Sequence, residues 1–436
     1  MTPIETLQQL KTSTGFAALG DAVGNLTLGR GTLNGHAVHV AIIENKIAAG
    51  SVGVKECDKL ASLFRIIAVQ KSPLLIYIDS AGARVSEGLP ALGAFRHMYR
   101  AAAEMALSGA PITAFLGTHC YGGASMLAAL AGQRVFSTST QLAMSGPTIL
   151  AAAAGVSSLD DAFRAIAEAS IDAAARAKLS PQNSLTWNSA VPPPLNQTDK
   201  WVQIHEQLGS HPTVAAALSL PQDQRQLGNA AGGVEGRLEG TVVQRKDVAA
   251  LYPDGYQAFE LGNIFYGKAK AAVEANGTNK ASEAKANIRL LGIVDRRLLG
   301  AARTWALAER VWKLAFKKPE RLHILVDCEA HSAQIDDERA MLSCYLADLT
   351  VALLSLARAG TKIETTVLGR VGGGVYVALA AASQKVNLLH GADIQLLPSR
   401  AVASILGDAD TQIYTIADYA KARVAEDELK VGFLRR

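Results

Sequence analysis

The second half of this 436-residue sequence repeats the first. Residues 109–117 (GAPITAFLG) are echoed by residues 360–369 (GTKIETTVLG), and a pair of adjacent glycines follows each segment. The matches keep an offset of about 250 residues, which is typical of an internal duplication. Chance agreement in a chain with 38 glycines would not hold several matches nearly in register. We therefore predict two domains of one fold. The matching segments are 74–79 with 323–327, 109–117 with 360–369, Gly122-Gly123 with Gly373-Gly374, and 131–135 with 382–386.

Each copy alternates strand patterns with helix patterns. In the first copy, Asn34-Gly35 supplies the positive φ angles of a two-residue turn, so residues 32–43 are expected to form a hairpin. Apolar residues then recur at helical or strand spacing. This alternation favours an α/β fold with a largely parallel sheet and crossover helices. The other predicted elements are helices at 55–70 and 89–107, strands at 74–78, 112–116, 134–136 and 141–144, and their counterparts in the second copy, which include a long helix at 337–358.

The character of the sequence changes between the two copies. Pro192-Pro193-Pro194 and Gly232-Gly233 are typical of a connecting segment. A helix is expected at 201–208 within it, packed on one of the domains. The predicted organisation is an N-terminal domain at 1–178, a linker or accessory segment at 179–233 and a C-terminal domain at 234–436.

Charge and cysteine content exclude several classes of partner. The net charge of +4 is balanced and dispersed, which argues against a nucleic-acid partner. The four cysteines show no C-x-x-C pair or ligand spacing, so no metal site is expected. Residues 1–14 lack a signal-peptide pattern, and no apolar run reaches membrane-spanning length. We therefore expect a cytoplasmic protein without a membrane segment.

Gly122 and Gly123 join an apolar strand to an Ala/Leu-rich helix. Without β-carbons they let a ligand approach the backbone, and N–H groups at a helix start have no intrahelical partner. A second turn, at residues 80–84, follows the preceding strand. One N–H group from each turn would form an oxyanion hole for a thioester enolate or a tetrahedral oxyanion. The sequence shows no Ser/His/Asp or Cys/His set at usable spacing, and neither glycine-rich turn fits a P-loop or the dinucleotide pattern G-x-G-x-x-G.

Six segments carry a family resemblance: 50–55 (GSVGVK), 80–87 (SAGARVSE), Gly122-Gly123, 145–147 (SGP), 369–374 (GRVGGG) and 394–404. With them the chain resembles the carboxyltransferase branch of the crotonase superfamily, and most closely the malonate decarboxylases. The first half is similar to the β subunits of that family and the second half to the γ subunits, as in a natural fusion. Two features depart from the family pattern, namely Ala81 in place of the usual glycine and the loop at 327–331 (DCEAH).

The resemblance implies two tandem crotonase-like domains, each a ββα spiral, with the active site at a junction between an N-type and a C-type domain. It also implies an acyl thioester substrate, carried on coenzyme A or on an acyl carrier protein with a phosphopantetheine-type arm. A homo-oligomer, with acyl-transferase subunits as further partners, is expected. Three hypotheses follow: decarboxylation of a malonyl-type thioester without biotin, a biotin-dependent acyl-CoA carboxyltransferase, and a non-catalytic scaffold that binds the carrier protein. No permanently bound cofactor is expected.

The candidate oxyanion donors lie at the two Gly-Gly turns. The backbone amides of Ala83 and Gly123 are the leading pair, with Gly122 as the alternative partner. The repeat predicts a second hole at Gly373 and Gly374. We expect Gly123→Val to remove turnover and to leave the fold largely intact.

Three residues close in sequence to the turn are candidates for the proton donor. They are His119, Tyr121 and Ser145, and each has a structural alternative. His119 can pack under the turn together with Cys120, Tyr121 can form a wall of the pocket, and Ser145 can cap the helix that begins near Pro147.

Three basic residues, Arg84, Lys55 and Arg30, are candidates for binding the thioester arm. Lys55 and Arg30 could meet its phosphates, although a solvated surface role is the default for either. Arg84 and Glu87 are spaced i and i+3, so a local ion pair that shapes the start of the following helix is the alternative for Arg84.

Overall fold

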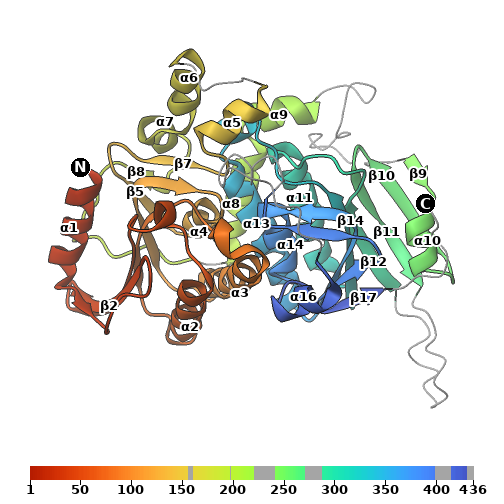
Figure 1. Ribbon diagram of the computed structural model, residues 1–436, viewed down its shortest axis with the longest axis horizontal. Helices are drawn as coiled ribbons and strands as arrows, with labels where there is room; N and C mark the ends of the chain where they lie inside the picture. Colours follow the sequence, from red (N-terminus) through yellow and green to blue (C-terminus); the bar gives the residue numbers. More distant parts are fainter. Residues whose placement is uncertain (156–160, 197, 220–240, 271–286, 398–413, 430–436) are drawn as a thin grey trace.

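The computed structural model describes residues 1–155, 161–196, 198–219, 241–270, 287–397 and 414–429. Within these residues the chain forms two α/β units, each built around one mixed sheet (Figure 1). The predicted α/β class is therefore confirmed. No helix of the described residues is long and apolar enough to cross a membrane.

The first sheet has the order β1 (Ala17–Ala18), β2 (Leu26–Leu33), β3 (His36–Ile43), β4 (Leu74–Ser80), β5 (Ile112–Tyr121), β6 (Gln133–Phe136) and β8 (Asn183–Ser184), with β7 (Gln141–Ala143) paired to β5. The predicted hairpin is confirmed as β2 and β3, and Asn34 and Gly35 turn it with φ angles of 51° and 79°. From β3 to β6 the neighbours are parallel, so their carboxyl ends lie at one edge of the sheet.

Helices cover this sheet and separate its parallel strands. The predicted helices at 55–70 and 89–107 are confirmed, and they pack against each other. The helices of the first unit are α1 (Pro3–Thr14), α2 (Val54–Gln70), α3 (Gly88–Leu107), α4 (Gly123–Ala129), α5 (Pro147–Ala153), α6 (Asp161–Ile171) and α7 (Ala173–Ala177).

The second sheet has the order β17 (Asp427–Leu429), β15 (Lys385–Leu389), β14 (Lys362–Gly372), β13 (Arg321–Cys328), β12 (Asn287–Ile293), β11 (Ile264–Lys270), β10 (Tyr256–Leu261) and β9 (Thr241–Val243), with β16 (Asp393–Gln395) paired to β14. Its strands from β12 to β15 are parallel, as in the first sheet. The helices of this unit are α10 (Lys246–Leu251), α11 (Ala301–Lys317), α12 (Ile335–Arg339), α13 (Leu342–Arg358), α14 (Gly373–Ala380) and α16 (Ile416–Lys421).

The long helix predicted at 337–358 is broken in two. Met341 has a φ of 63°, a left-handed conformation that an α-helix does not accommodate, and it separates α12 from α13. The helical periodicity of the sequence does not reveal this break, because apolar spacing reports which face is buried and not the local φ angle.

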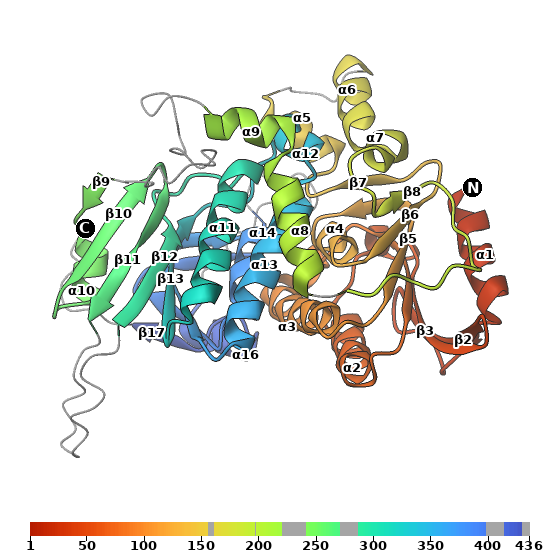
Figure 2. The same ribbon diagram turned by 180° about the vertical axis from the view of Figure 1, so that it is seen from behind.

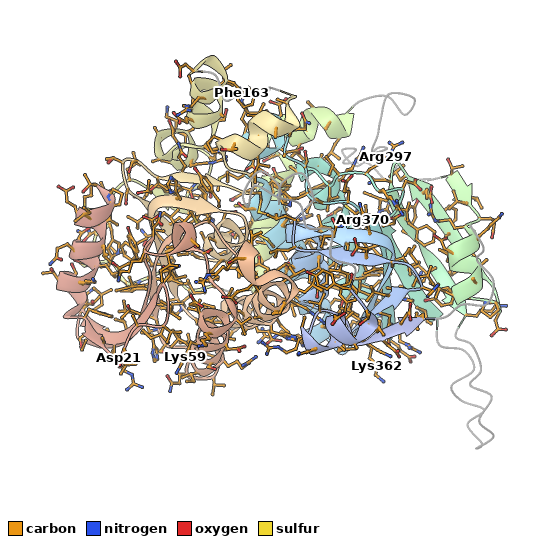
Figure 3. The ribbon with its side chains drawn as sticks, viewed as in Figure 1. Asp21, Lys59, Phe163, Arg297, Lys362 and Arg370 are labelled. Atoms are coloured by element: carbon orange, nitrogen blue, oxygen red, sulfur yellow. The ribbon has the colours of Figure 1, made fainter. Side chains whose placement is uncertain are left out.

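The predicted duplication is repeated in backbone detail. The carboxylate of Asp79 accepts the N–H groups of Thr118 and His119, both at 3.0 Å, where the β4–β5 pairing shifts register. In the second unit Asp327 accepts the N–H of Arg370 at 2.9 Å at the matching shift between β13 and β14, and Arg370 lies on the ribbon of β14 in Figure 3. Each shift precedes a Gly-Gly turn. The turns agree closely, with φ angles of 55° at Gly122 and 54° at Gly373.

The two units share one hydrophobic core. Helices α3 and α4 pack against α13, and α3 also packs against α14 (Figure 2). Arg96 of α3 is buried there and donates to the carbonyl oxygens of Ala380 and Val424, both at 3.1 Å. An apolar junction of this kind holds the units together, because large hydrophobic contacts oppose relative motion of domains.

The connecting segment packs along this junction. The helix predicted at 201–208 is confirmed as α8 (Thr198–Gly209), and α9 (Pro212–Ser219) follows it. Helix α8 lies against α11 and α13. Gly232-Gly233, and the part of the 394–404 segment from residue 398 onward, lie outside the described residues. The domain boundaries stay a prediction.

A charged cluster fixes α8 to the second unit. His205 of α8 is 3% exposed and bonds to Asp348 through Nδ1 at 2.7 Å and to Glu309 through Nε2 at 2.9 Å. Its ring stacks on Trp305 with the ring centroids 5.0 Å apart. Burial by itself would lower the pKa of His205, but the hydrogen bonds and charges of the two carboxylates outweigh it and raise the pKa to about 9.

We expect this cluster to make the free energy of unfolding depend on pH. Because the folded-state pKa of His205 is raised from 6.5 to about 9, its contribution is complete below pH 6.5 and is lost as the pH rises through 9. The contribution is on the order of 3 kcal/mol. Urea unfolding from pH 6 to 10 should show a steeper fall for the wild type than for His205→Gln. Parallel pH profiles for the two proteins would contradict the assignment.

Candidate active site

Two turns follow the carboxyl ends of β4 and β5 and meet at Gly82. Gly82 has a φ of 90°, which favours glycine. A β-carbon at this position would lie 2.9 Å from the amide nitrogen of Gly123 and 3.0 Å from the carbonyl oxygen of Tyr121. The loop after β4 therefore touches the start of α4. The two turns converge, as the order of parallel strands predicts.

The amides of Ala83 and Gly123 have no hydrogen-bond acceptor among the described residues. Both residues are partly exposed. Gly122 differs, because its N–H is donated to the carbonyl oxygen of Ala143 at 3.1 Å. That bond removes Gly122 from the candidate donors and leaves the leading pair.

A short parallel bridge fixes the backbone on both sides of Ala83. Val52 donates its N–H to the carbonyl of Gly82 at 2.8 Å and accepts the N–H of Arg84 at 2.9 Å. Since the groups that flank Ala83 bond to Val52, the N–H of Ala83 points away from this bridge. The backbone of Ala83 is thus fixed, while its own N–H makes no hydrogen bond to a described residue.

Of the three basic candidates, Arg84 and Lys55 lie near this loop. Arg84 donates to Glu87 at 2.8 Å, to the carbonyl of Ser51 at 2.7 Å and to the buried carboxylate of Glu56. The alternative hypothesis of a local Arg84–Glu87 pair is confirmed. The guanidinium also bonds to Ser51 and Glu56, so most of its donors are occupied within the loop. Lys55 is exposed in the first turn of α2, next to Val54, whose N–H bonds to Glu87 at 2.8 Å.

Arg30 lies at the opposite edge of the sheet from the turns. It is paired with His39 across the hairpin, and His39 aligns with Leu74 at the start of β4. Leu74 aligns in turn with Ile112, where β5 begins. The structure therefore does not bring Arg30 to the site. The sequence could not reveal this, because the position of the residue depends on the strand order of the sheet.

His119 and Tyr121 lie beside the first turn. Their rings are 5.3 Å apart, and the hydroxyl of Tyr121 bonds to the side-chain oxygen of Gln141. Burial raises the pKa of Tyr121, so the hydroxyl stays protonated and is the donor of the hydrogen bond to Gln141. Cys120 is fully buried between them, in agreement with the packing role that was the alternative.

In the second unit His331 stands where the first unit has Ala83. Leu299 bridges to the loop around His331 with the same two backbone bonds that Val52 makes, at 3.0 and 2.9 Å. The sequence offset also matches. The donor position of the second turn therefore carries an imidazole side chain in place of a methyl group.

The second Gly-Gly turn is closed. Gly373 and Gly374 are both buried. A β-carbon at Gly374 would lie 2.6 Å from the methyl carbon of Met144 and 3.3 Å from the sulfur of Met126, both from the first unit. A β-carbon at Gly373 would lie 3.3 Å from Nδ1 of His331. The second turn is thus packed against Met144, Met126 and His331, and the second oxyanion hole stays a prediction.

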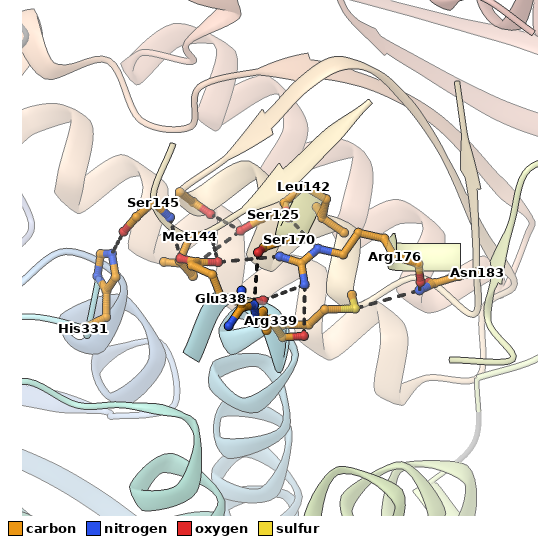
Figure 4. A network of polar contacts seen from close by, with 12 residues as sticks. Ser125, Leu142, Met144, Ser145, Ser170, Arg176, Asn183, His331, Glu338 and Arg339 are labelled. Carbon is orange, nitrogen blue, oxygen red and sulfur yellow. Dashed lines mark hydrogen bonds and ion pairs between the residues drawn. The ribbon is translucent and has the colours of Figure 1, made fainter. Parts of the chain in front are cut away.

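Ser145 and His331 meet where the two units join (Figure 4). The hydroxyl oxygen of Ser145 lies 3.5 Å from Nε2 of His331. The carboxylate of Glu338 accepts the N–H groups of Ser145 at 2.7 Å and Met144 at 3.0 Å. Ser145 does not cap α5, because Gly146 is the residue at that cap. The Ser145 backbone is instead held by α12 of the opposite unit.

Glu338 and Arg176 are buried charges at the same junction, and both are 0% exposed. Arg176 donates to the carbonyl oxygens of Leu142 at 2.9 Å and of Glu338 at 2.6 Å, while its Nη2 lies 3.9 Å from the Glu338 carboxylate. Burial raises the pKa of Glu338 to about 7, against the attraction of Arg176. Burial lowers the pKa of Arg176 to about 10. The two charges connect the first unit to α12.

His331 is a neutral imidazole in this setting. Burial lowers its pKa to about 4, and its Nδ1 is shielded from solvent and has no partner among the described residues. Sequence reasoning did not predict His331, Glu338 or Arg176 as site residues. A signal existed for His331, since aligning the two turns places it on Ala83. None existed for Glu338, which is 193 residues from Ser145 in the sequence.

A known protein family matches the first unit. Residues 4–163 match the carboxyl transferase domain. The two mixed sheets agree with the predicted pair of tandem α/β domains, and the match covers the first of them. The described residues contain no cluster of His, Cys, Asp or Glu that could hold a metal ion.

Two curated relatives match part of this chain. The methylmalonyl-CoA carboxyltransferase 12S subunit of Propionibacterium freudenreichii subsp. shermanii is 30% identical over 128 residues, 29% of this chain and 24% of that protein. An acetyl-coenzyme A carboxylase carboxyl transferase subunit beta 1 of Roseiflexus sp. (strain RS-1) is 34% identical over 116 residues, 27% of this chain and 38% of that protein. The chain thus matches well under two thirds of the length of either relative.

Two solved structures overlap this chain at low identity. The transcarboxylase 12S hexamer with hydrolysed methylmalonyl-coenzyme A covers 97% of this chain and 86% of its own, at 17% identity and a TM-score of 0.37. A Pseudomonas malonate decarboxylase hetero-tetramer with malonate covers 39% and 71%, at 21% identity and a TM-score of 0.36.

We expect Gly123 to tolerate no β-carbon, contrary to the expectation that Gly123→Val leaves the fold intact. A β-carbon there would lie 2.3 Å from the ring of Phe95, which is 2% exposed. Overpacking of this kind costs about 1–3 kcal/mol. In urea unfolding, Gly123→Ala should be destabilised in the wild-type background and much less so in a Phe95→Leu background. An equal cost in both backgrounds would show that the Phe95 ring is not the obstacle.

Proposed function

We propose that the first turn holds the oxyanion of a thioester enolate and that the protein decarboxylates a malonyl-type thioester. The observation that supports this is that Ala83 and Gly123 are partly exposed residues on touching turns and that their N–H groups have no acceptor among the described residues. Loss of the substrate carboxylate as CO₂ leaves an electron pair on the α-carbon, and that pair is delocalised onto the thioester oxygen. Two amides directed at this oxygen stabilise the charge as it develops.

The local architecture suits this chemistry because the donors are fixed before the reaction begins. The bridge to Val52 sets the backbone around Ala83, and the start of α4 sets the amide of Gly123. A preorganised donor needs no rearrangement as charge moves onto the oxygen. Ala81, the departure from the family pattern, is partly exposed beside this turn and leaves the Ala83 amide unpaired.

Transfer of a carboxyl group is the second candidate, and the match of residues 4–163 to the carboxyl transferase domain favours it. In this reaction the same enolate either takes up the carboxyl group of carboxybiotin or is formed when the carboxylated thioester passes its carboxyl group to biotin. Both candidates use one oxyanion site, so the site does not distinguish them. The requirement for biotin distinguishes the two reactions. The third hypothesis, a scaffold that only binds an acyl carrier protein, would leave the two amides without a catalytic use.

The thioester arm is proposed to approach from the side of Lys55. This residue is exposed at the start of α2 and close to the loop that carries Ala83, so it can meet a phosphate of coenzyme A or of a phosphopantetheine arm. Arg84 supports the loop through its carboxylate pairs. We also propose a homo-oligomer, with acyl-transferase subunits as partners where the acyl group is loaded onto a carrier protein.

We expect Gly82→Ala to reduce turnover by about a hundred- to a thousandfold, the usual effect of losing one oxyanion donor. Its β-carbon would lie 2.9 Å from the Gly123 amide and block the approach of the substrate oxygen. Gly20→Ala is the matched control, because Gly20 has a similar φ of 101° and no atom within 4 Å of the added carbon. The measurement is acetyl-thioester formation from malonyl-coenzyme A and from a malonyl-carrier protein.

The same assay separates the candidate functions. Product without biotin supports decarboxylation, and product only with a biotinylated partner supports carboxyl transfer. Tight binding without product in either assay supports the scaffold. Equal activity of Gly82→Ala and Gly20→Ala would overturn the assignment of the turn.

A further inference from the structure

Glu338 of the second unit bonds to the segment that supports the first turn. Its two carboxylate oxygens accept the N–H groups of Met144 at 3.0 Å and Ser145 at 2.7 Å (Figure 4). Glu338 is fully buried and comes from α12, which belongs to the opposite unit. Because hydrogen bonds to a charged acceptor are shorter and stronger than neutral ones, these two bonds fix the backbone of Met144 and Ser145 against α12.

A single peptide group connects Glu338 to the first turn. The peptide group between Ala143 and Met144 donates its N–H to Glu338, and its carbonyl oxygen accepts the N–H of Gly122 at 3.1 Å. A peptide group is planar and rigid, and in the trans form its N–H and its C=O point in opposite directions. Glu338 therefore holds one end of a rigid unit, and the other end of that unit holds Gly122.

The N–H of Gly123 belongs to the next peptide group of the turn. It shares a plane with the carbonyl oxygen of Gly122, which accepts the hydroxyl of Ser125 at 2.7 Å. The hydroxyl oxygen of Ser125 also lies 3.3 Å from the sulfur of Met144. The direction of the Gly123 N–H is thus set by the Ala143 carbonyl on one side of Gly122 and by Ser125 on the other. Both contacts depend on where the segment with Met144 lies.

The surroundings of Glu338 show that its carboxylate serves the backbone. Arg176 donates from Nε to the carbonyl oxygen of Leu142 at 2.9 Å and from Nη1 to the carbonyl oxygen of Glu338 at 2.6 Å. Its Nη2 lies 3.9 Å from the carboxylate and has no hydrogen-bond partner among the described residues. The buried carboxylate therefore gives its short hydrogen bonds to two backbone N–H groups and not to the neighbouring guanidinium.

We propose that Glu338 is a positioning residue for the oxyanion site. It fixes the peptide group between Ala143 and Met144 and, through Gly122, the direction of the Gly123 N–H. The effect on catalysis rests on the proposed function of the first turn, because an oxyanion donor is effective only when it points to where charge develops. The second unit, whose own Gly-Gly turn is packed, thus contributes to the site of the first unit.

The structural link is tested by NMR without any assay of catalysis. Only Tyr121 and Tyr266 precede a glycine, so labelling with carbonyl-¹³C tyrosine and ¹⁵N-glycine selects the amides of Gly122 and Gly267. Glu338→Gln replaces one acceptor oxygen by an NH₂ donor. We expect the Gly122 amide to shift and to exchange with D₂O about two- to tenfold faster, the effect of weakening one hydrogen bond. Gly267, in β11, is the internal reference and should not change.

Catalysis provides the second measurement. We expect Glu338→Gln to lower kcat for CO₂ release from malonyl-coenzyme A by about ten- to a hundredfold, the usual effect of a small misplacement. KM should change little, because a misdirected oxyanion donor weakens binding of the transition state and not of the substrate.

Two further variants serve as the control and as a substitute. Asp336→Asn is the matched control, because this carboxylate lies on the same helix, is 66% exposed and bonds only to Arg339 at the surface. Its NMR spectrum and kcat should match those of the wild type. Glu338→Asp keeps a negative charge beside Arg176 but is one methylene shorter, so it should change both measurements in the same direction as Glu338→Gln. It carries the test if Glu338→Gln does not fold.

The possible outcomes separate this inference from the proposed function. A Gly122 amide that is unchanged in a folded Glu338 variant, or that changes equally in Asp336→Asn, overturns the link. A Gly122 amide that shifts while kcat stays at the wild-type value overturns the effect on catalysis. Failure of both Glu338 variants to fold shows a role in the fold and overturns a separate role in positioning. A wild type that releases no CO₂ overturns the proposed function, whereas the NMR result still decides the link.

Discussion

The carboxylate of Asp79 is the interaction on which the site depends. It accepts two backbone N–H groups, from Thr118 and His119, that the register shift of β5 removes from the sheet. Buried amides without partners are costly, so without this carboxylate the shift would be unfavourable. After the register shift the chain enters the Gly122-Gly123 turn. The amide of Gly123, the first residue of α4, has no acceptor among the described residues. Asp327 performs the same task in the second unit. One side chain thus links strand pairing to the proposed oxyanion site, which consists only of backbone.

Much of this arrangement could be read from the sequence, because its determinants are local. Glycines that must adopt positive φ angles or approach another backbone mark the turns, and apolar periodicity marks α2 and α3. The duplication was visible because both copies keep these features. The sequence does not show which contacts each copy makes around its Gly-Gly turn. The contact of His331 with Ser145 and the burial of Gly374 under Met144 are set by how the units pack. Met341 shows the same limit within one helix, where a single φ angle overrode the pattern.

The junction between the units is unusual in carrying charge as well as apolar contact. Arg176 and Glu338 are fully buried, and a buried ion pair is weak evidence for stability because its desolvation cost is large. The geometry points to a different benefit. Glu338 uses both carboxylate oxygens to hold the backbone of Met144 and Ser145, so it determines where that segment lies. Displacing it by even a small distance would part Ser145 from His331 and open the methionine packing over Gly374.

Because Ser145 and His331 belong to one polypeptide, their encounter is intramolecular. Two separate subunits would have to find each other, and the fraction assembled would fall as the protein is diluted. Covalent linkage replaces the bulk concentration by a high local one set by the connecting segment, and here α8 is itself docked on α11 and α13. Synthesis as a single chain also fixes the ratio of the two halves at one to one. A contact between the halves, such as that of Ser145 with His331, therefore does not dissociate when the protein is diluted.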